Sequence, residues 1–160
     1  MIKNYLWIFL ISMVPLIELR GAIPVSQALQ MPIIPSYIVS IIGNMLPVPV
    51  IYFFARKVLE WGADKKFIGK IFTAILVKGT NAGQKIQEKA GKGFFIALFL
   101  FVGIPLPGTG AWTGTLAASL LGLSFKETVI AVILGVLLAG LIMMAGSLGL
   151  YTAIFAAIGK

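Results

Sequence analysis

The chain contains no cysteine and no histidine, and only 11% of its 160 residues are charged. Without cysteine there is no disulfide framework, thiol nucleophile or thiolate metal site, and without histidine the commonest metal ligand and proton shuttle is missing. A Ser/His/Asp set is therefore impossible, and no two carboxylates lie close together within the apolar segments. We expect no enzyme activity, no metal and no cofactor.

Apolar residues dominate the composition, at 59% of the chain, and the mean hydropathy is +1.03. Soluble domains average about 45–50% apolar residues, and a small soluble fold could not bury such an excess. The solvent of this chain must therefore be lipid. The length suits one membrane domain over residues 1–160, and we expect a multi-pass protein of the cytoplasmic (inner) membrane.

Basic residues are concentrated in one part of the chain. Nine of the thirteen lie between Arg56 and Lys92. A nucleic-acid patch is disfavoured because apolar segments flank this stretch and it offers little base stacking. The positive-inside rule instead predicts that residues 56–92 form a cytoplasmic loop. This loop contains an apolar stripe at helical spacing, which predicts an amphipathic helix on the membrane surface; its members are Ile68, Ile71, Phe72, Ile75 and Leu76.

Two segments, Ser36–Ala55 and Thr128–Leu150, are uncharged and long enough to cross a bilayer. Other apolar segments are too short to do so, and Pro/Gly breaks divide them into pairs. Such half-helices predict re-entrant hairpins, because irregular backbone at membrane depth survives only beside protein or a water-filled cavity. The paired segments are Tyr5–Ile17 with Ala22–Leu29, and Phe94–Ile104 with Thr113–Leu123.

The two halves of the chain, residues 1–55 and 93–160, follow the same order of features: a broken hairpin and then one full span. Residues at an offset of about ninety match, which predicts an all-α membrane protein of two inverted-topology repeats, with its site where the repeats meet. The matched pairs include Pro15/Pro105, Leu29/Leu121, Ser36/Thr128, Ile41/Ile133 and Gly43/Gly135.

Glu18 and Arg20 are the charged residues that fall inside the expected membrane region, where an ionisable group is costly and by default functional. Pro15, Gly21 and Pro24 around them favour non-helical backbone, in which the two side chains share one side. Arg20 could then bind a phosphate or carboxylate, and Glu18 could exchange a proton or coupling ion. The alternative is a mutually neutralising pair that only fixes the hairpin.

The second break, Gly103–Gly114, cannot be helical across Pro105–Gly110. A helix that starts near Gly110–Thr113 would point N-terminal amides at the interior and favour an anion, although glycines also serve helix packing. Asn44 marks a polar, kinked point before Pro47, with hydrogen bonding between helices as its alternative role. The predicted substrate-binding residues are Glu18, Arg20, Asn44, Pro107, Gly108, Thr109, Gly110, Trp112 and Thr113.

The segments Pro15–Pro24 and Gly103–Trp112 resemble the small multidrug export protein family, over nearly the whole chain. That family is in turn distantly similar to the DedA/VTT superfamily. The resemblance implies two facing re-entrant loops and ion-coupled movement of lipids or undecaprenyl phosphate. Glu18 matches the superfamily's acidic position in the first loop. Its arginines in the second loop have no counterpart, because Thr109 and Thr113 occupy that break here.

Three hypotheses of function follow. The first is an ion- or proton-coupled transporter or flippase for an anionic lipid carrier resembling undecaprenyl phosphate. The second is a small multidrug exporter of lipophilic compounds, which needs Glu18 as counter-charge and is disfavoured by the neighbouring Arg20. The third is a scaffold or assembly factor, which predicts a packed interior with no cavity at Glu18. The expected partners are membrane lipids, a small amphiphilic or anionic substrate and, because two spans enclose little space, a second copy in a homodimer.

Overall fold

The computed structural model describes residues 2–65, 69–74, 76, 77, 81, 93–106 and 108–158. All regular secondary structure within these residues is α-helix, so the expectation of an all-α protein is confirmed for this part of the chain. The helices are α1 (Ile2–Met13), α2 (Glu18–Ala28), α3 (Ile33–Met45), α4 (Pro47–Ala63), α6 (Gly93–Gly103), α7 (Ala111–Leu120) and α8 (Phe125–Ile158).

The helices α1, α2, α6 and α7 are short, at 10–12 residues each. At about 1.5 Å per residue, such a helix covers little more than half of a hydrocarbon core about 30 Å thick. A turn over residues 14–17 separates α1 from α2, and the described residues between Ile104 and Gly110 are not helical. Proline explains both ends, because it disfavours helical backbone in the residue before it and has no N–H. The prediction of paired short helices is confirmed.

Two helical segments, Ile33–Ala63 and Phe125–Gly149, are long and apolar enough to cross a membrane. The first contains the predicted span Ser36–Ala55, and the second contains the predicted span Thr128–Leu150 except for its last residue. The first comprises α3 and α4, which meet at Leu46, where Pro47 and Pro49 remove two backbone donors. Helix α4 continues to Ala63, so the start of the expected loop over residues 56–92 is a continuation of this helix.

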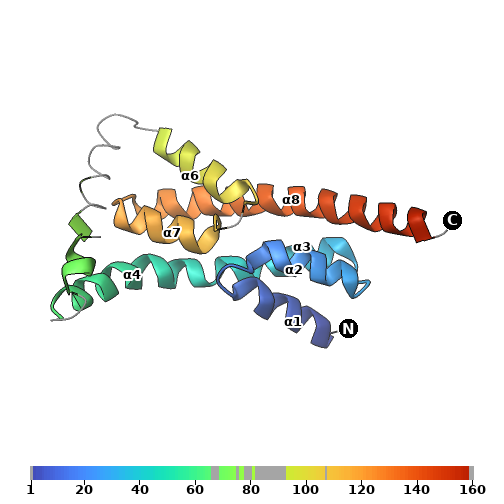
Figure 1. Ribbon diagram of the computed structural model, residues 1–160, viewed down its shortest axis with the longest axis horizontal. Coiled ribbons are helices and arrows are strands. Elements are labelled where there is room, and N and C mark those ends of the chain that lie inside the picture. The colour runs from blue at the N-terminus through green and yellow to red at the C-terminus, as the bar shows by residue number, and fades with distance from the viewer. Residues whose placement is uncertain are drawn as a thin grey trace.

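The short helices form two hairpins that approach each other tip to tip. Figure 1 shows α1 running inward from one end of the molecule and α2 returning, while α6 runs inward from the opposite end and α7 returns. The long α3–α4 and α8 segments run along the same axis in opposite directions. The two breaks consequently meet near the middle of the molecule, far from either end of the long helices.

The turns that follow the two hairpins have the same hydrogen-bond pattern. Gln30, after α2, has φ +54°, and Gly122, after α7, has φ +77°. In each turn a left-handed residue lets the next N–H bond back into the last helical turn, as in a Schellman cap. These bonds join Met31 N–H to the Ser26 oxygen and Leu123 N–H to the Ala118 oxygen, both at 3.0 Å.

The long helices also pack on the hairpins at matching positions. A Cβ atom added to Gly43 would lie 2.6 Å from the Phe9 carbonyl oxygen on α1, and one added to Gly135 would lie 2.9 Å from the Phe99 oxygen on α6. Both values are too short for real contacts, so only glycine permits this approach. Small residues serve the same purpose between helices throughout membrane proteins.

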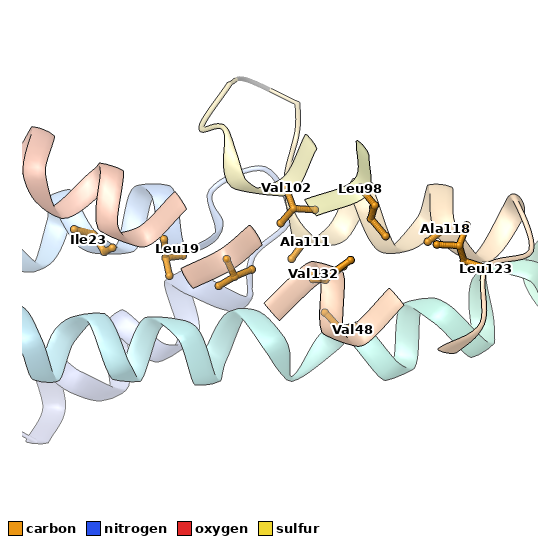
Figure 2. Packing of buried hydrophobic residues seen from close by; sticks show 11 residues of the cluster. Leu19, Ile23, Val48, Leu98, Val102, Ala111, Ala118, Leu123 and Val132 are labelled. Carbon is orange, nitrogen blue, oxygen red and sulfur yellow. The ribbon is translucent and has the colours of Figure 1, made fainter. Parts of the chain in front are cut away.

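A single buried apolar cluster connects the two hairpins with the long helices. Figure 2 shows side chains of α2, α4, α6, α7 and α8 meeting between the ribbons. Most of them are small or β-branched, which allows close helix packing without large voids. The labelled members are Leu19, Ile23, Val48, Leu98, Val102, Ala111, Ala118, Leu123 and Val132.

Large apolar side chains cover the outside of the helices. Ile34 is 65% exposed, Leu6 57% and Val50 57%. A soluble protein scatters a few such residues singly, whereas an apolar surface of this extent indicates a lipid environment. The chain is therefore a membrane protein with transmembrane helices.

The predicted amphipathic helix is only partly covered by the structure. Residues 69–74, 76 and 77 are helical, whereas Ile68 and Ile75 lie outside the described residues. Phe72 packs on Gly62 of α4, where a Cβ atom would overlap its ring. Ile71, another member of the stripe, is 61% exposed.

Candidate functional site

Glu18 and Arg20 lie in the first turn of α2, so the prediction of non-helical backbone is wrong at Arg20, whereas Glu18, the first residue of the helix, has a left-handed φ of +50°. The break lies just before them, over residues 14–17. Pro24 does not end the helix, because at its position it removes only the bond to the Arg20 carbonyl, and membrane helices tolerate such a loss. Two residues apart on a helix, the side chains leave in different directions. Both nevertheless reach the second break.

The Glu18 carboxylate caps the N-terminus of α7. The backbone N–H of Ala111 donates to Oε2 at 3.2 Å, and the N–H of Trp112 donates to Oε1 at 3.0 Å. These amides have no partner within their own helix, and they lie at the positive end of its dipole. Glu18 is only 4% exposed. A carboxylate from the first hairpin therefore satisfies the start of a helix in the second.

The approach of Glu18 depends on Gly110. A Cβ atom at this position would lie 2.7 Å from Cδ of Glu18 and would overlap both carboxylate oxygens. No side chain larger than hydrogen can occupy this place while the two bonds to α7 remain. Gly110 is therefore a positioning residue for the carboxylate.

Arg20 binds the other side of the same break. Its Nη2 donates to the carbonyl oxygens of Val102 at 3.2 Å and Ile104 at 3.3 Å, and its Nη1 donates to the oxygen of Leu106. These carbonyls lie at and just beyond the C-terminus of α6, which is the negative end of its dipole. The guanidinium thus stabilises the end of α6 as the carboxylate stabilises the start of α7.

Glu18 and Arg20 do not form a salt bridge with each other. Within the described residues, the pair of opposite charges whose nitrogen and oxygen atoms lie within 4.0 Å of each other is Arg56 with Glu60. Each of the two charges faces a helix end of opposite sign instead. The pair therefore connects the two hairpins, which an isolated neutralising pair on one hairpin would not do.

A third side chain, that of Trp112, also connects the two hairpins: its indole Nε1–H donates to the carbonyl oxygen of Met13 at 3.1 Å. Met13 is the last residue of α1. Beside it, Leu16 has φ +71° and Glu18 has φ +50°, in the left-handed region that costs a non-glycine residue about 1–2 kcal/mol. Such strain persists only where surrounding contacts hold it, and it concentrates at functional sites.

A pocket of about 510 Å³ opens beside these bonds, between α4, α7 and the two breaks. Glu18 is the ionisable group among the described residues that line it, and the remaining walls are almost entirely apolar. The α4 wall follows a helical stripe at i, i+3, i+4, i+7 and i+8. This wall consists of Ile51, Phe54, Ala55, Val58 and Leu59, and Leu116 and Leu120 of α7 face it.

The structure brings five of the predicted site residues to this pocket: Glu18, Gly108, Thr109, Trp112 and Thr113. The hydroxyl of Thr109 donates to the carbonyl oxygens of Ile104 at 3.0 Å and Leu106 at 2.9 Å, within its own break. The hydroxyls of this break are therefore partly used by its own backbone.

The other predicted residues lie elsewhere. Arg20 and Gly110 contact the opposite break without lining the pocket, and Pro107 lies outside the described residues. Asn44 is 2% exposed and away from the pocket, and its Oδ1 has no hydrogen-bond partner within the described part of the chain. The hydroxyl of Thr115 is buried without a partner in the same way.

The α4 wall was missed by sequence reasoning. Its stripe is visible in the sequence, because Arg56, Lys57 and Glu60 mark the polar side of the same helix. The uncharged residues before Arg56 conceal the pattern, since a membrane span is apolar on every face. The carbonyl of Met13 gave no signal at all, because a backbone acceptor is present in every residue.

Comparison with known proteins identifies the family. Residues 18–142 match the family model described as "Putative small multi-drug export protein", and the chain belongs to this family. The match begins at Glu18, directly after the first break, and includes the second break and α8 through residue 142. No curated protein and no solved structure matches the chain.

Proposed function

We propose that this member of the small multi-drug export family is a secondary transporter that exports lipophilic compounds, with the pocket at Glu18 as its substrate site. The observation that carries the proposal is an apolar pocket of about 510 Å³ with a buried carboxylate as its ionisable group. Ligand pockets are typically about 300–1,000 Å³, mostly apolar, with few polar groups that orient the ligand.

An anionic lipid carrier fits this site less well. The groups expected to bind its phosphate are already bonded: Arg20 to the α6 carbonyls, and the α7 amides to Glu18. A phosphate would have to displace a carboxylate from a helix N-terminus and would then lie beside that carboxylate. The scaffold hypothesis predicts no cavity at Glu18, and the pocket supports transport over it.

In the membrane, we propose that α1–α2 and α6–α7 are re-entrant hairpins that enter from opposite sides and belong to two inverted repeats. Their length, the matched turns after α2 and α7, and the matched packing of Gly43 and Gly135 support this arrangement. The basic stretch over residues 56–92 would lie in the cytoplasm, in line with the positive-inside rule. A homodimer would enclose more of the site than one chain.

Glu18 is the proposed coupling group. As a carboxylate it holds the N-terminus of α7 through Ala111 and Trp112. A proton or a cationic substrate that arrives through the pocket neutralises this charge, and the attraction to the helix dipole falls. The start of α7 can then move away from α2, while Arg20 keeps α2 bonded to the end of α6. Proton and substrate would compete for one carboxylate, which is how an exchanger couples two fluxes.

The test is transport in proteoliposomes with a pH gradient and the lipophilic cation tetraphenylphosphonium as the probe. We expect Glu18→Gln to lower gradient-driven transport by at least about tenfold, because the amide cannot change charge. Ala55→Phe should weaken probe binding by filling the pocket while Glu18 stays intact. Glu127→Gln is the matched control, since Glu127 is bonded to Ser124 away from the pocket.

Normal transport by folded Glu18→Gln would overturn the assignment of the coupling group. Normal binding and transport by Ala55→Phe would overturn the assignment of the pocket. If wild-type protein binds the probe with Ala55→Phe sensitivity but moves nothing under any gradient, the pocket stands and the transport function fails.

A further inference from the structure

A second hollow, of about 350 Å³, lies between α4 and the turn that joins α7 to α8. Its walls are held by two bonds between these elements: Ser119 Oγ donates to the Tyr52 carbonyl oxygen at 2.7 Å, and the Tyr52 hydroxyl donates to the Leu123 oxygen. Arg56 and Lys57 stand on its α4 side, and Gly122 lies on the other. It shares no lining residue with the pocket at Glu18.

The two basic side chains at this hollow, Arg56 and Lys57, have N–H groups that are not engaged with a carboxylate of the described residues. Nε of Arg56 donates to Oε1 of Glu60 at 3.0 Å, and a guanidinium has four further N–H groups. Lys57 lies 5.8 Å from the centre of the Phe54 ring, and within the described residues no carboxylate lies within 4.0 Å of it. The nearby acid on α8, Glu127, is already bonded to Ser124 at 2.7 Å in a helix cap. An added anion would therefore meet two cations.

The hollow lies at the level where we expect the hydrocarbon core of the membrane to end, because the uncharged helical segments end there. Arg56 is the first charge after the uncharged stretch Ile33–Ala55, and Glu127 is the last before the uncharged part of α8. Figure 1 places the end of α4 and the start of α8 at the same end of the molecule. An aromatic cluster adjoins this level, because the rings of Tyr52 and Phe53 lie 5.2 Å and 4.8 Å from that of Phe125. Aromatic residues gather at the headgroup region of a bilayer.

We propose that this hollow binds the phosphate of a phospholipid headgroup, with Arg56 and Lys57 as its donors. A lipid fits better than free phosphate because Phe53 on the same wall is 52% exposed and offers an apolar surface for the acyl chains. Glu60 opposes binding, since it occupies one donor of Arg56 and adds a like charge next to the phosphate. The site is independent of transport through the pocket at Glu18.

The experiment is native mass spectrometry of the full chain released from detergent, titrated with phosphatidylglycerol. We expect one tightly held lipid per chain. Lys57→Gln should weaken its binding by about tenfold, the usual loss for one charge-assisted hydrogen bond. Glu60→Gln should strengthen binding, because it removes the negative charge next to the phosphate and weakens the bond to the guanidinium. The matched control is Lys65→Gln, on the same side of the membrane but stacked 4.5 Å over Trp61 and outside the hollow.

Four results would overturn the proposal. Equal weakening by Lys65→Gln would mean that diffuse basic charge attracts the lipid. Equal binding of diacylglycerol would mean that the acyl chains are recognised without the phosphate. Displacement of the lipid by inorganic phosphate at a comparable concentration would make this a site for the free anion. Weaker lipid binding by Glu60→Gln would likewise contradict the assigned geometry.

Discussion

The two breaks share one left-handed backbone position and have opposite chemistry. At the offset of ninety that matches Pro15 with Pro105, Glu18 corresponds to Gly108 and Arg20 to Gly110. Glu18 has φ +50° and Gly108 has φ +79°, so the backbone takes a left-handed conformation at the same place in both. One break supplies the two charges and the other supplies glycines. The difference shows how two similar hairpins can become complementary.

The complementarity has a simple electrostatic origin. Each break leaves one helix C-terminus and one helix N-terminus exposed in an apolar environment, where unpaired backbone groups cost about 1–3 kcal/mol each. In the second break these ends are bonded to Arg20 and Glu18 of the first. If both breaks carried charges, the buried like charges would repel; if both carried glycines, the helix ends would lack partners. Because only one hairpin carries charges, the helix ends of the second break have hydrogen-bond partners, and only two charged side chains are needed.

The largest effect is expected from exchanging the two charges, with Glu18→Arg and Arg20→Glu in one chain. Net charge and composition stay the same. A guanidinium would then face the α7 amides and a carboxylate the α6 carbonyls, each at a helix end of its own sign. We expect a loss of at least about 4 kcal/mol in the free energy of unfolding, or failure to fold. Unfolding in detergent with increasing dodecyl sulfate measures it.

The same exchange separates two explanations of the pair. If Glu18 and Arg20 only neutralised each other, the exchanged chain would keep its stability to within about 1 kcal/mol. That result would show that the bonds between the two hairpins contribute little. The single variants Glu18→Gln and Arg20→Gln serve as milder references, because each keeps part of the hydrogen bonding while removing one charge.

A smaller effect is expected from alanine at the two glycines that correspond to the charges. Gly110→Ala should lower the free energy of unfolding by about 2–3 kcal/mol, because its Cβ would displace the Glu18 carboxylate. Gly108→Ala should cost only about 1 kcal/mol, the penalty of a left-handed alanine, since nothing lies within 4 Å of its Cβ. Equal losses would contradict the role of Gly110 as a positioning residue. Thermal unfolding in detergent compares the two.

The sequence predicts the helices well because the signals are local. Uncharged length predicts the two spans, and Pro105 with the following glycines predicts the second break and the start of α7 near Gly110. Charge scarcity also singles out Glu18 and Arg20. These inferences need only composition and spacing along the chain. The inferences on helices hold because lipid forces every backbone group to bond within the protein.

The partners of those charges could not be predicted in the same way. Arg20 bonds to carbonyls more than eighty residues away, and any residue offers a carbonyl. The helical conformation at Arg20 was missed because Gly21 and Pro24 have poor helix propensity, which the bonds to the other hairpin outweigh. The pocket wall on α4 was hidden for a related reason: within a membrane span, hydropathy no longer distinguishes a face that lines a cavity from one that meets lipid.

The smallest effect tests whether the two halves share a backbone beyond the breaks. Gln30 and Gly122 occupy equivalent left-handed positions, at φ +54° and +77°. If the turns are equivalent, Gln30→Gly should stabilise the chain by about 0.5–1 kcal/mol by removing backbone strain, and Gly122→Gln should destabilise it by about 1 kcal/mol. Unfolding in dodecyl sulfate, with Gln27→Gly inside α2 as the control that must destabilise, measures both.

The signs matter more than the sizes, because glycine ordinarily destabilises a folded chain through the entropy of its unfolded state. Gln30→Gly can raise the free energy of unfolding only if the left-handed backbone strains Gln30. Gly122→Gln would introduce the same strain at the equivalent position. Loss at both positions would mean that the turn after α2 relaxes to another conformation, and the likeness of the two halves would then end at the hairpins. If Gln30→Gly stabilises the chain and Gly122→Gln destabilises it, the likeness of the two halves extends from the breaks to the turns that lead into the long helices.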